Sequence, residues 1–125
     1  MTAHRRMSHK LTRFQRIQHS RDFERLKKEG QRLAQGCMVA NWLPRTAGDD
    51  SRLGVITSRR IGGAVLRNRA RRLLRESFRR HQHQFHTPLD LVLVARPSIV
   101  GKRFQEVEVD FLKVLKRGHL LRATS

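Results

Sequence analysis

Several residue types on which many enzymes depend are scarce in this chain. Its 125 residues include one cysteine, no tyrosine and ten Asp and Glu together. The single cysteine, Cys37, excludes an intramolecular disulfide framework and a cysteine-cluster metal site, and it fits a reducing compartment. Apolar runs stay well short of the roughly 20 residues of a membrane span, and the first residues lack the apolar centre of a secretory signal. We therefore expect a soluble, cytoplasmic protein without a membrane partner.

The few acids face a large excess of bases. Twenty-eight Lys and Arg give a formal net charge of +18. Such a charge destabilises a compact chain by self-repulsion unless a polyanion, usually nucleic acid, shares the surface. Arg outnumbers Lys by 22 to 6, which favours specific phosphate contacts because a guanidinium is a planar, two-pronged fork. A GC-rich genome, whose codons favour Arg, would produce the same bias in residue type.

The length suits one domain, because a chain of this size buries about two-thirds of its unfolded surface. The first acid is Asp22, so we interpret residues 1–19 as a basic, mobile arm. An organellar transit peptide is the alternative for this Arg-rich start. Residues 20–118 form the expected domain, and residues 119–125 form a short tail.

Hydrophobic spacing and breaker residues predict a mixture of helices and strands. Ser20 or Asp22 is the expected N-cap of a first helix that Gly30 stops. The other expected elements are one strand or two short ones over 31–43, a strand over 53–57, a long helix over 64–84, a central strand over 89–95 that is covered on both faces, and an amphipathic helix from about Phe104 that Gly118 caps.

The long helix is the most informative segment. At 100° per residue its apolar and small side chains form one stripe, and its bases lie opposite. The stripe is Leu66, Ala70, Leu73, Leu74, Ser77 and His81, and the opposite face is Asn68, Arg71, Arg72, Arg75 and Arg79. Guanidinium groups one turn apart repel, and only Glu76 offers local relief. We interpret this face as a polyanion-binding ridge, because a solvated structural face would normally intersperse acids.

Two further features invite functional interpretations. The Gly62-Gly63 pair before the long helix exposes backbone N–H groups that could hold a phosphate, although a tight turn explains it equally well. The segment lacks the Gly-Lys-Ser/Thr ending of a P-loop, which argues against a nucleoside triphosphate site. His81, His83 and His86 have no carboxylate or cysteine at ligand spacing, so we interpret them as solvated helix-end histidines and expect no metal site.

Around this helix the chain resembles the bacterial ribonuclease P protein subunit, whose hallmark is an Arg-Asn-Arg helix after a strand and a basic turn. Arg67-Asn68-Arg69 carries the hallmark, the likeness covers 52–78 closely, and Asp22-Phe23 and the segment 90–96 also look like family segments. The resemblance implies a single α/β (α+β) domain with the order α-β-β-β-α-β-α, a four-stranded sheet and a left-handed βαβ crossover, a handedness that is rare.

The resemblance also implies a function. The family's protein assists a catalytic RNA, one protein to one RNA, in the endonucleolytic removal of the 5′ leader from precursor tRNA. The protein is the accessory subunit of this enzyme, with no catalytic residue and no cofactor of its own, and the RNA holds the magnesium. By resemblance, the side chains that contact the catalytic RNA are Arg59, Arg60, Arg67, Asn68, Arg69, Arg71, Arg72 and Arg75.

A second family surface is a cleft between the first helix and the sheet, which receives the single-stranded leader and lets bases stack on aromatic rings. Phe23 matches a cleft aromatic, with a purely core role as its alternative. Lys27 and Asn41 stand where many relatives carry Phe and Tyr. This departure weakens base stacking but offers Lys27 to a leader phosphate and Asn41 to a base.

Two other functions compete with this hypothesis. A structural, basic RNA-binding protein of ribosomal type is the alternative, and it would bind ribosomal RNA in preference to complexes with precursor tRNA. A self-sufficient protein nuclease is the third, but no Ser-His-Asp arrangement or carboxylate pair emerges from the sequence.

Overall fold

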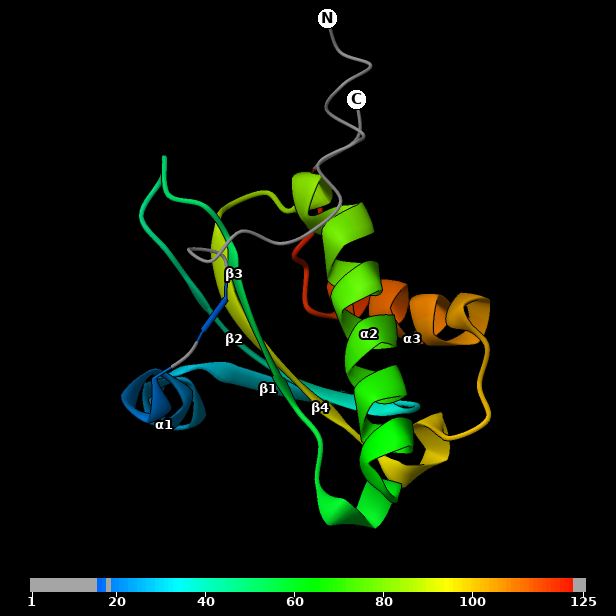
Figure 1. Ribbon diagram of the computed structural model, residues 1–125. Helices are drawn as coiled ribbons and strands as arrows, with labels where there is room; N and C mark the ends of the chain where they lie inside the picture. Colours follow the sequence, from blue (N-terminus) through cyan, green and yellow to red (C-terminus); the bar gives the residue numbers. More distant parts are fainter. Residues whose placement is uncertain (1–15, 18, 123–125) are drawn as a thin grey trace, which may run out of the picture.

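The computed structural model describes residues 16, 17 and 19–122 of the chain. In this part, three α-helices and four strands follow the expected order α-β-β-β-α-β-α (Figure 1). They are α1 (Ser20–Glu29), β1 (Gln31–Gln35), β2 (Met38–Pro44), β3 (Arg52–Ile56), α2 (Ala64–His81), β4 (Leu89–Ala95) and α3 (Phe104–Arg117). Nearly all of the arm assigned to residues 1–19, and the end of the tail, lie outside the described residues.

Several predicted boundaries shift by a few residues. The N-cap of α1 is His19, whose side chain makes no capping hydrogen bond, so the prediction of Ser20 or Asp22 was wrong. The long helix α2 ends at His81 instead of Gln84, because the chain tightens into a 3-10 turn over Gln82–Gln84. The extended segment after Gly30 is two short strands, β1 and β2, joined by a turn.

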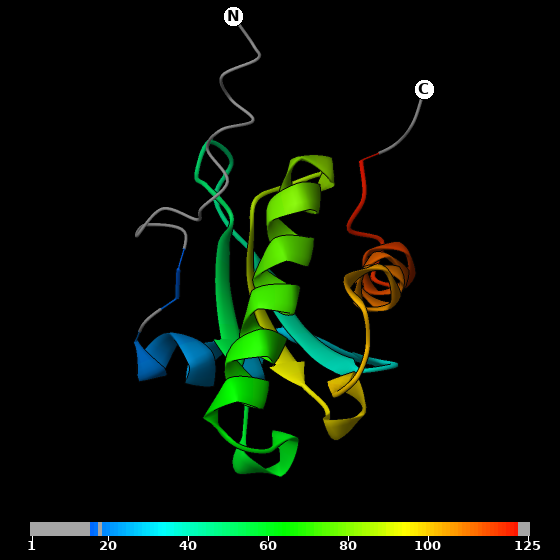
Figure 2. The same ribbon diagram turned by 45° about the vertical axis from the view of Figure 1, so that its right-hand side comes forward.

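The strands form one mixed sheet in the order β1-β2-β4-β3. The β1–β2 and β2–β4 pairs are antiparallel, whereas β3 and β4 are parallel neighbours. The connection from β3 to β4 runs through α2. With α2 in front of the sheet and both strands running downward, β4 lies to the right of β3 (Figure 2). This arrangement makes the crossover left-handed, as expected, although βαβ connections are right-handed in nearly all proteins.

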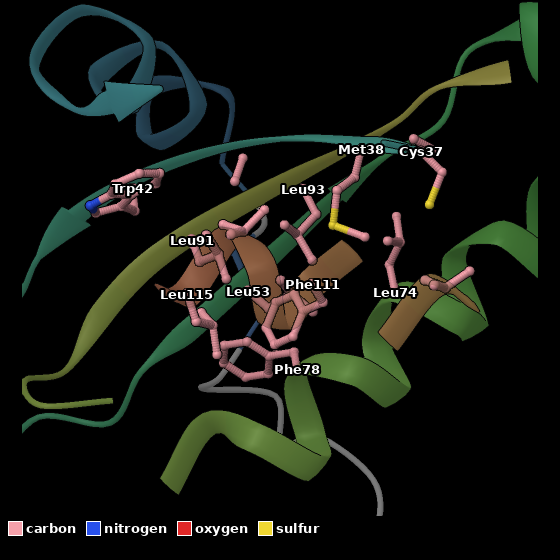
Figure 3. Close-up of a cluster of buried hydrophobic side chains, with 14 of the residues drawn as sticks. Cys37, Met38, Trp42, Leu53, Leu74, Phe78, Leu91, Leu93, Phe111 and Leu115 are labelled. Carbon is pink, nitrogen blue, oxygen red and sulfur yellow. The ribbon is translucent and has the colours of Figure 1, made fainter. Parts of the chain in front are cut away.

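Helices cover both faces of the sheet, with α1 on one side and α2 and α3 on the other (Figure 1). Alternate side chains point to opposite faces of a strand, so β4 serves two hydrophobic clusters. The larger one lies under α2 and α3 and includes Met38, Leu74, Phe78, Leu93 and Phe111 (Figure 3). The smaller one lies under α1 and contains Ile17, Leu26 and Val92. The central strand is therefore buried on both faces, which confirms the prediction.

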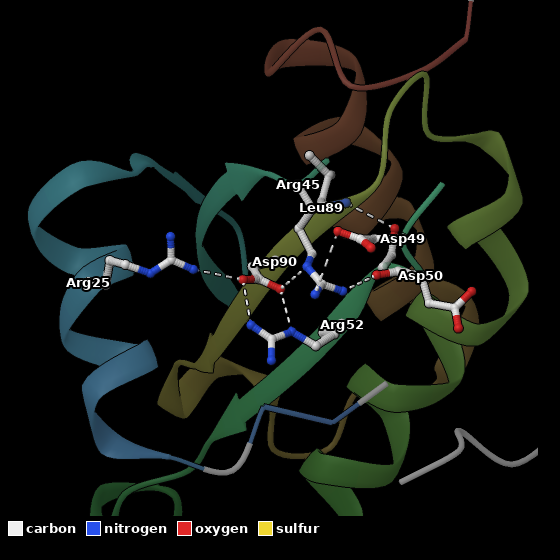
Figure 4. Close-up of polar contacts among 8 residues, drawn as sticks. Arg25, Arg45, Asp49, Asp50, Arg52, Leu89 and Asp90 are labelled. Atoms are coloured by element: carbon white, nitrogen blue, oxygen red, sulfur yellow. Dashed lines mark hydrogen bonds and ion pairs between the residues drawn. The ribbon is translucent and has the colours of Figure 1, made fainter. Parts of the chain in front are cut away.

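Asp90 is the one charged residue of this buried strand. Its side chain is 1% exposed and accepts hydrogen bonds from Arg52 Nε at 2.7 Å and Arg25 Nη2 at 3.1 Å, and Arg45 Nε lies at 3.4 Å (Figure 4). The hydrogen bond to Asp90 raises the pKa of Arg52. A buried carboxylate is costly unless it is paired and hydrogen-bonded. This cluster therefore ties α1, β3 and the end of β2 to the centre of the sheet.

Replacing Asp90 with Asn should lower the free energy of unfolding by about 3 kcal/mol, because the change leaves guanidinium groups around a neutral amide. The control is Asp49→Asn. Asp49 is 45% exposed, lies 3.9 Å from Arg45 Nη2, and its loss should cost less than about 1 kcal/mol. Urea unfolding of the three proteins measures the difference, and equal losses for the two variants would contradict the assignment.

Candidate nucleic-acid interface

The helix α2 packs with one face and presents the other to solvent. Ala70, Leu74, Ser77 and Phe78 are its buried residues, while Asn68 and Arg72 are exposed. The predicted stripe fails at its start, because Leu66 is 40% exposed. Leu66 belongs to the first turn of α2, which extends past the end of the sheet (Figure 1). The structure therefore places the cationic face of α2 on the side that is open to solvent, and the N-terminal end of the helix also carries exposed apolar surface.

Three arginines in the first half of α2 are held by neutral acceptors. Arg67 Nη1 donates to the carbonyl of Gly62 at 2.7 Å, and Arg69 Nη2 donates to the carbonyl of Lys102 at 2.8 Å. Arg71 Nη1 donates to Thr57 Oγ1 at 2.6 Å, and its Nη2 donates to Asn68 Oδ1. Carbonyl, hydroxyl and amide oxygens orient a guanidinium without cancelling its charge. These side chains are therefore pre-positioned and remain cationic.

Like charges crowd around Arg75 in the middle of the same face. Burial lowers the pKa of Arg75, and the nearby charges of Arg16 and Arg71 lower it further. Arg16 lies in the chain before α1, where its backbone forms a single parallel β-bridge with Leu53 of β3. An anion bound here would relieve the repulsion, because each guanidinium would gain an opposite charge. A shallow hollow of about 470 Å³ lies beside this group, between Val65 and Arg75.

The turn before α2 supplies the other two predicted arginines. Arg59 and Arg60 are exposed on a 3-10 turn over Arg59–Ile61, and Ser58 Oγ accepts a hydrogen bond from the Arg60 backbone N–H at 3.3 Å. Gly62 follows with a φ of 136°, in the range that only glycine adopts easily. This geometry accounts for Gly62 as a turn residue.

The leader-cleft residues lie on the opposite, α1-covered side of the sheet. Phe23 is half-buried, and its ring packs so closely on Gly54 of β3 that a Cβ there would lie 2.8 Å from Phe23 Cε1. Lys27, one turn further along α1, is exposed. Asn41 of β2 lies beside Val92 in the same sheet face and is only 7% exposed. Phe23 and Lys27 therefore present surface on this side of the sheet, whereas Asn41 presents little.

The thiol of Cys37 and the imidazole of His81, the other groups that could carry chemistry, take part in packing and in contacts within the protein. Burial raises the pKa of the Cys37 thiol to about 12, which leaves it an inert thiol. His81 is not solvated, contrary to the prediction: its side chain is 14% exposed and its Nε2 lies 2.7 Å from Glu108 Oε2 of α3. Across the described ranges, no group of three or more His, Cys, Asp or Glu could hold a metal ion.

Two side-chain arrangements escaped the sequence analysis. It gave Asp90 no partner, although a carboxylate in a buried strand signals a paired charge. It used Phe104 only as the start of an amphipathic helix, but the ring is half-buried, and the guanidinium of Arg80 lies 4.7 Å from its centroid. No helix within residues 19–122 is long and apolar enough to cross a membrane.

The chain is thus a small basic α+β domain with a left-handed crossover and a set of pre-positioned arginines on α2. The ribonuclease P family model matches residues 11–119. The ribonuclease P protein component of Syntrophomonas wolfei is 37% identical over 105 residues, which cover 84% of this chain and 87% of that protein. That of Pelotomaculum thermopropionicum is 36% identical over 107 residues, covering 86% and 95%.

Solved structures agree with these sequence relatives. The Staphylococcus aureus RNase P protein superposes with a TM-score of 0.77 at 29% identity, covering 86% of this chain and 98% of that one. The Thermotoga maritima RNase P protein superposes with a TM-score of 0.70 at 34% identity, covering 82% and 96%. The chain belongs to the ribonuclease P protein family, whose members are components of an enzyme of tRNA processing. The resemblance drawn from the Arg-Asn-Arg helix is thereby confirmed.

Proposed function

We propose that this chain is the RNA-binding subunit of a ribonuclease P holoenzyme in which a catalytic RNA removes the 5′ leader from precursor tRNA. The observation that carries the proposal is the set of α2 arginines held by uncharged oxygens. Arg67, Arg69 and Arg71 are oriented at 2.6–2.8 Å by a carbonyl or a hydroxyl, so their charges stay available for phosphate. A ribosomal-type protein could use the same chemistry, but membership of this family favours the ribonuclease P assignment.

The proposed contribution of the protein is electrostatic. One protein binds one RNA through the eight residues that the resemblance assigns to the catalytic RNA, and their guanidinium groups replace counterions that the crowded phosphates would otherwise need. These residues are Arg59, Arg60, Arg67, Asn68, Arg69, Arg71, Arg72 and Arg75. The RNA holds the magnesium and performs the cleavage, and the protein binds no cofactor. Arg72 is exposed, and Arg75 lies among like charges. A phosphate would therefore give Arg72 a partner and would offset the repulsion around Arg75.

The proposed second contact is with the leader, at the α1 side of the sheet. The half-buried ring of Phe23 exposes part of its surface for one base, and exposed Lys27 can meet a phosphate of the same strand. Asn41, at 7% exposure, can reach a base only at the edge of the cleft. Because mature tRNA lacks the leader, this contact strengthens binding of substrate over product.

The protein alone should not cleave precursor tRNA, and it should raise cleavage by the cognate RNA most strongly at low magnesium, where counterions are scarce. Reconstitution of the full chain with that RNA, over a magnesium titration, measures both effects. Cleavage by nuclease-free protein without the RNA, or stimulation that does not depend on magnesium, would overturn the proposal.

Replacing Arg67, Arg69 and Arg72 with Ala should weaken assembly with the catalytic RNA and flatten its salt dependence. Each lost phosphate contact removes roughly one unit from the slope of log affinity against log salt. The control variant removes the same charge from the exposed Lys113, Lys116 and Arg117 of α3.

Binding titrations at several salt concentrations compare the two triple variants. Unfolding is measured alongside, because the hydrogen bonds of Arg67 and Arg69 each stabilise the fold by about 1 kcal/mol. An unchanged slope for the α2 variant, or an equal change for the α3 control, would rule out this face.

Phe23→Leu, which keeps apolar volume but removes the ring, should lower the affinity of the holoenzyme for precursor tRNA several-fold. Stacking on one aromatic contributes about 1 to 3 kcal/mol per base, and we expect the low end because Phe23 is half-buried. Affinity for mature tRNA should not change. Lys27→Ala should reduce the salt dependence of leader binding. If Phe23→Leu weakens precursor and mature tRNA equally, Phe23 is only a core residue.

A further inference from the structure

An open hollow of about 900 Å³ lies along α2 from Arg69 to Arg80 and reaches the start of α3, and the family resemblance assigns no role to its Arg80 and Phe104 end. Six arginines line it, with Leu73, Glu76, Phe104 and Gln105; they are Arg16, Arg69, Arg72, Arg75, Arg79 and Arg80. Glu76 is the one acid among these lining residues. The excess of positive charge makes an anionic occupant favourable.

Arg80 is held in a fixed plane at the rim of this hollow. Its guanidinium lies 4.7 Å from the ring centroid of Phe104, within the range of a cation–π contact. Its Nε donates to Glu76 Oε2 at 2.7 Å. Phe104 is itself fixed at the first residue of α3, where the Arg103 backbone N–H donates to Glu106 Oε1 at 2.9 Å. A long, flexible side chain is thus pre-organised on two sides.

The pre-organised guanidinium still has a free surface. The Arg80 side chain is 52% exposed although it contacts both Phe104 and Glu76. The planar guanidinium is a stacking surface for an unpaired base, as are aromatic rings. Glu76 does not repel an RNA strongly here, because its carboxylate already accepts hydrogen bonds from the cationic Arg79 and Arg80.

We propose that Arg80 and Phe104 form a stacking platform for one unpaired nucleotide of the catalytic RNA, whose flanking phosphates lie against Arg69 and Arg72. The inference rests on the RNA-binding function proposed above and extends its interface beyond the Arg-Asn-Arg end of α2. The RNA partner is the catalytic one because Arg69 and Arg72 line the hollow and are also among the residues assigned to the catalytic RNA. A duplex does not fit the platform, since its bases are stacked on one another and cannot splay onto a side chain.

Two substitutions separate stacking from charge. Arg80→Lys keeps the charge but loses the plane, and Phe104→Leu keeps apolar volume but loses the ring. Each should weaken assembly of the holoenzyme at least about five-fold, the low end for one stacked base, without changing the salt slope. Lys113→Gln, which removes an exposed charge of α3, is the control and should leave affinity within two-fold, as an exposed charge outside the interface contributes little.

A second measurement locates the nucleotide. Acylation of RNA 2′-hydroxyl groups, with and without protein, should reveal one unpaired nucleotide of the catalytic RNA that the wild-type protein protects and that regains reactivity with both platform variants. Footprints that are identical for all three proteins, lost protection that falls within a duplex, or a loss of affinity confined to precursor tRNA would each overturn the platform.

The failure of this inference is distinguishable from failure of the proposed function. If the triple variant of Arg67, Arg69 and Arg72 loses assembly while both platform variants assemble like the wild type, RNA binding stands and the platform is wrong. If none of these variants weakens assembly, both proposals fall. Urea unfolding of Arg80→Lys and Phe104→Leu guards against a loss of affinity caused by unfolding.

Discussion

The carboxylate of Asp90 is the constraint on which the arrangement of this molecule depends. It lies in β4, a strand that is buried on both faces, and a charge there is tolerated only with close partners. Arg25 and Arg52 meet that need from α1 and β3 (Figure 4). Arg25 lies on the same helix as Phe23, whose ring packs on Gly54 of β3 on the side of the sheet where we propose that the leader binds.

The molecule uses its few acids and its many arginines in two different ways. Around Asp90, arginines from other elements meet a buried carboxylate, and these ion pairs stabilise the contacts between the elements. Along the N-terminal half of α2, arginines such as Arg67 and Arg71 meet uncharged oxygens instead. The guanidinium groups of these arginines are held by hydrogen bonds, but no carboxylate in the described part of the chain offsets their charge. The distinction separates arginines that stabilise the fold from arginines that are available to a polyanion.

Much of the fold followed from local patterns, because spacing and breaker residues act within a few positions. The order of elements, the burial of β4 and the cationic side of α2 were predicted correctly from the sequence and the family resemblance. Predictions about ends and margins were weaker. Leu66 is 40% exposed although it falls on the packed stripe of α2, and His81, which is 14% exposed, lies 2.7 Å from Glu108 of α3. The spacing within the helix does not encode the end of the packed surface or the partner on another helix.

By itself, the sequence determined the charge, the single domain, the helical faces and the family, since these depend on residue type and spacing. Only the tertiary structure decided which arginine meets which acceptor. Arg69 finds the carbonyl of Lys102, 33 positions along the chain, and Arg80 stacks on Phe104 from another helix. These partners depend on how α2 packs against α3 and the segment before it. Only the tertiary structure therefore shows which guanidinium groups are paired with a carboxylate and which contact a neutral oxygen or a ring.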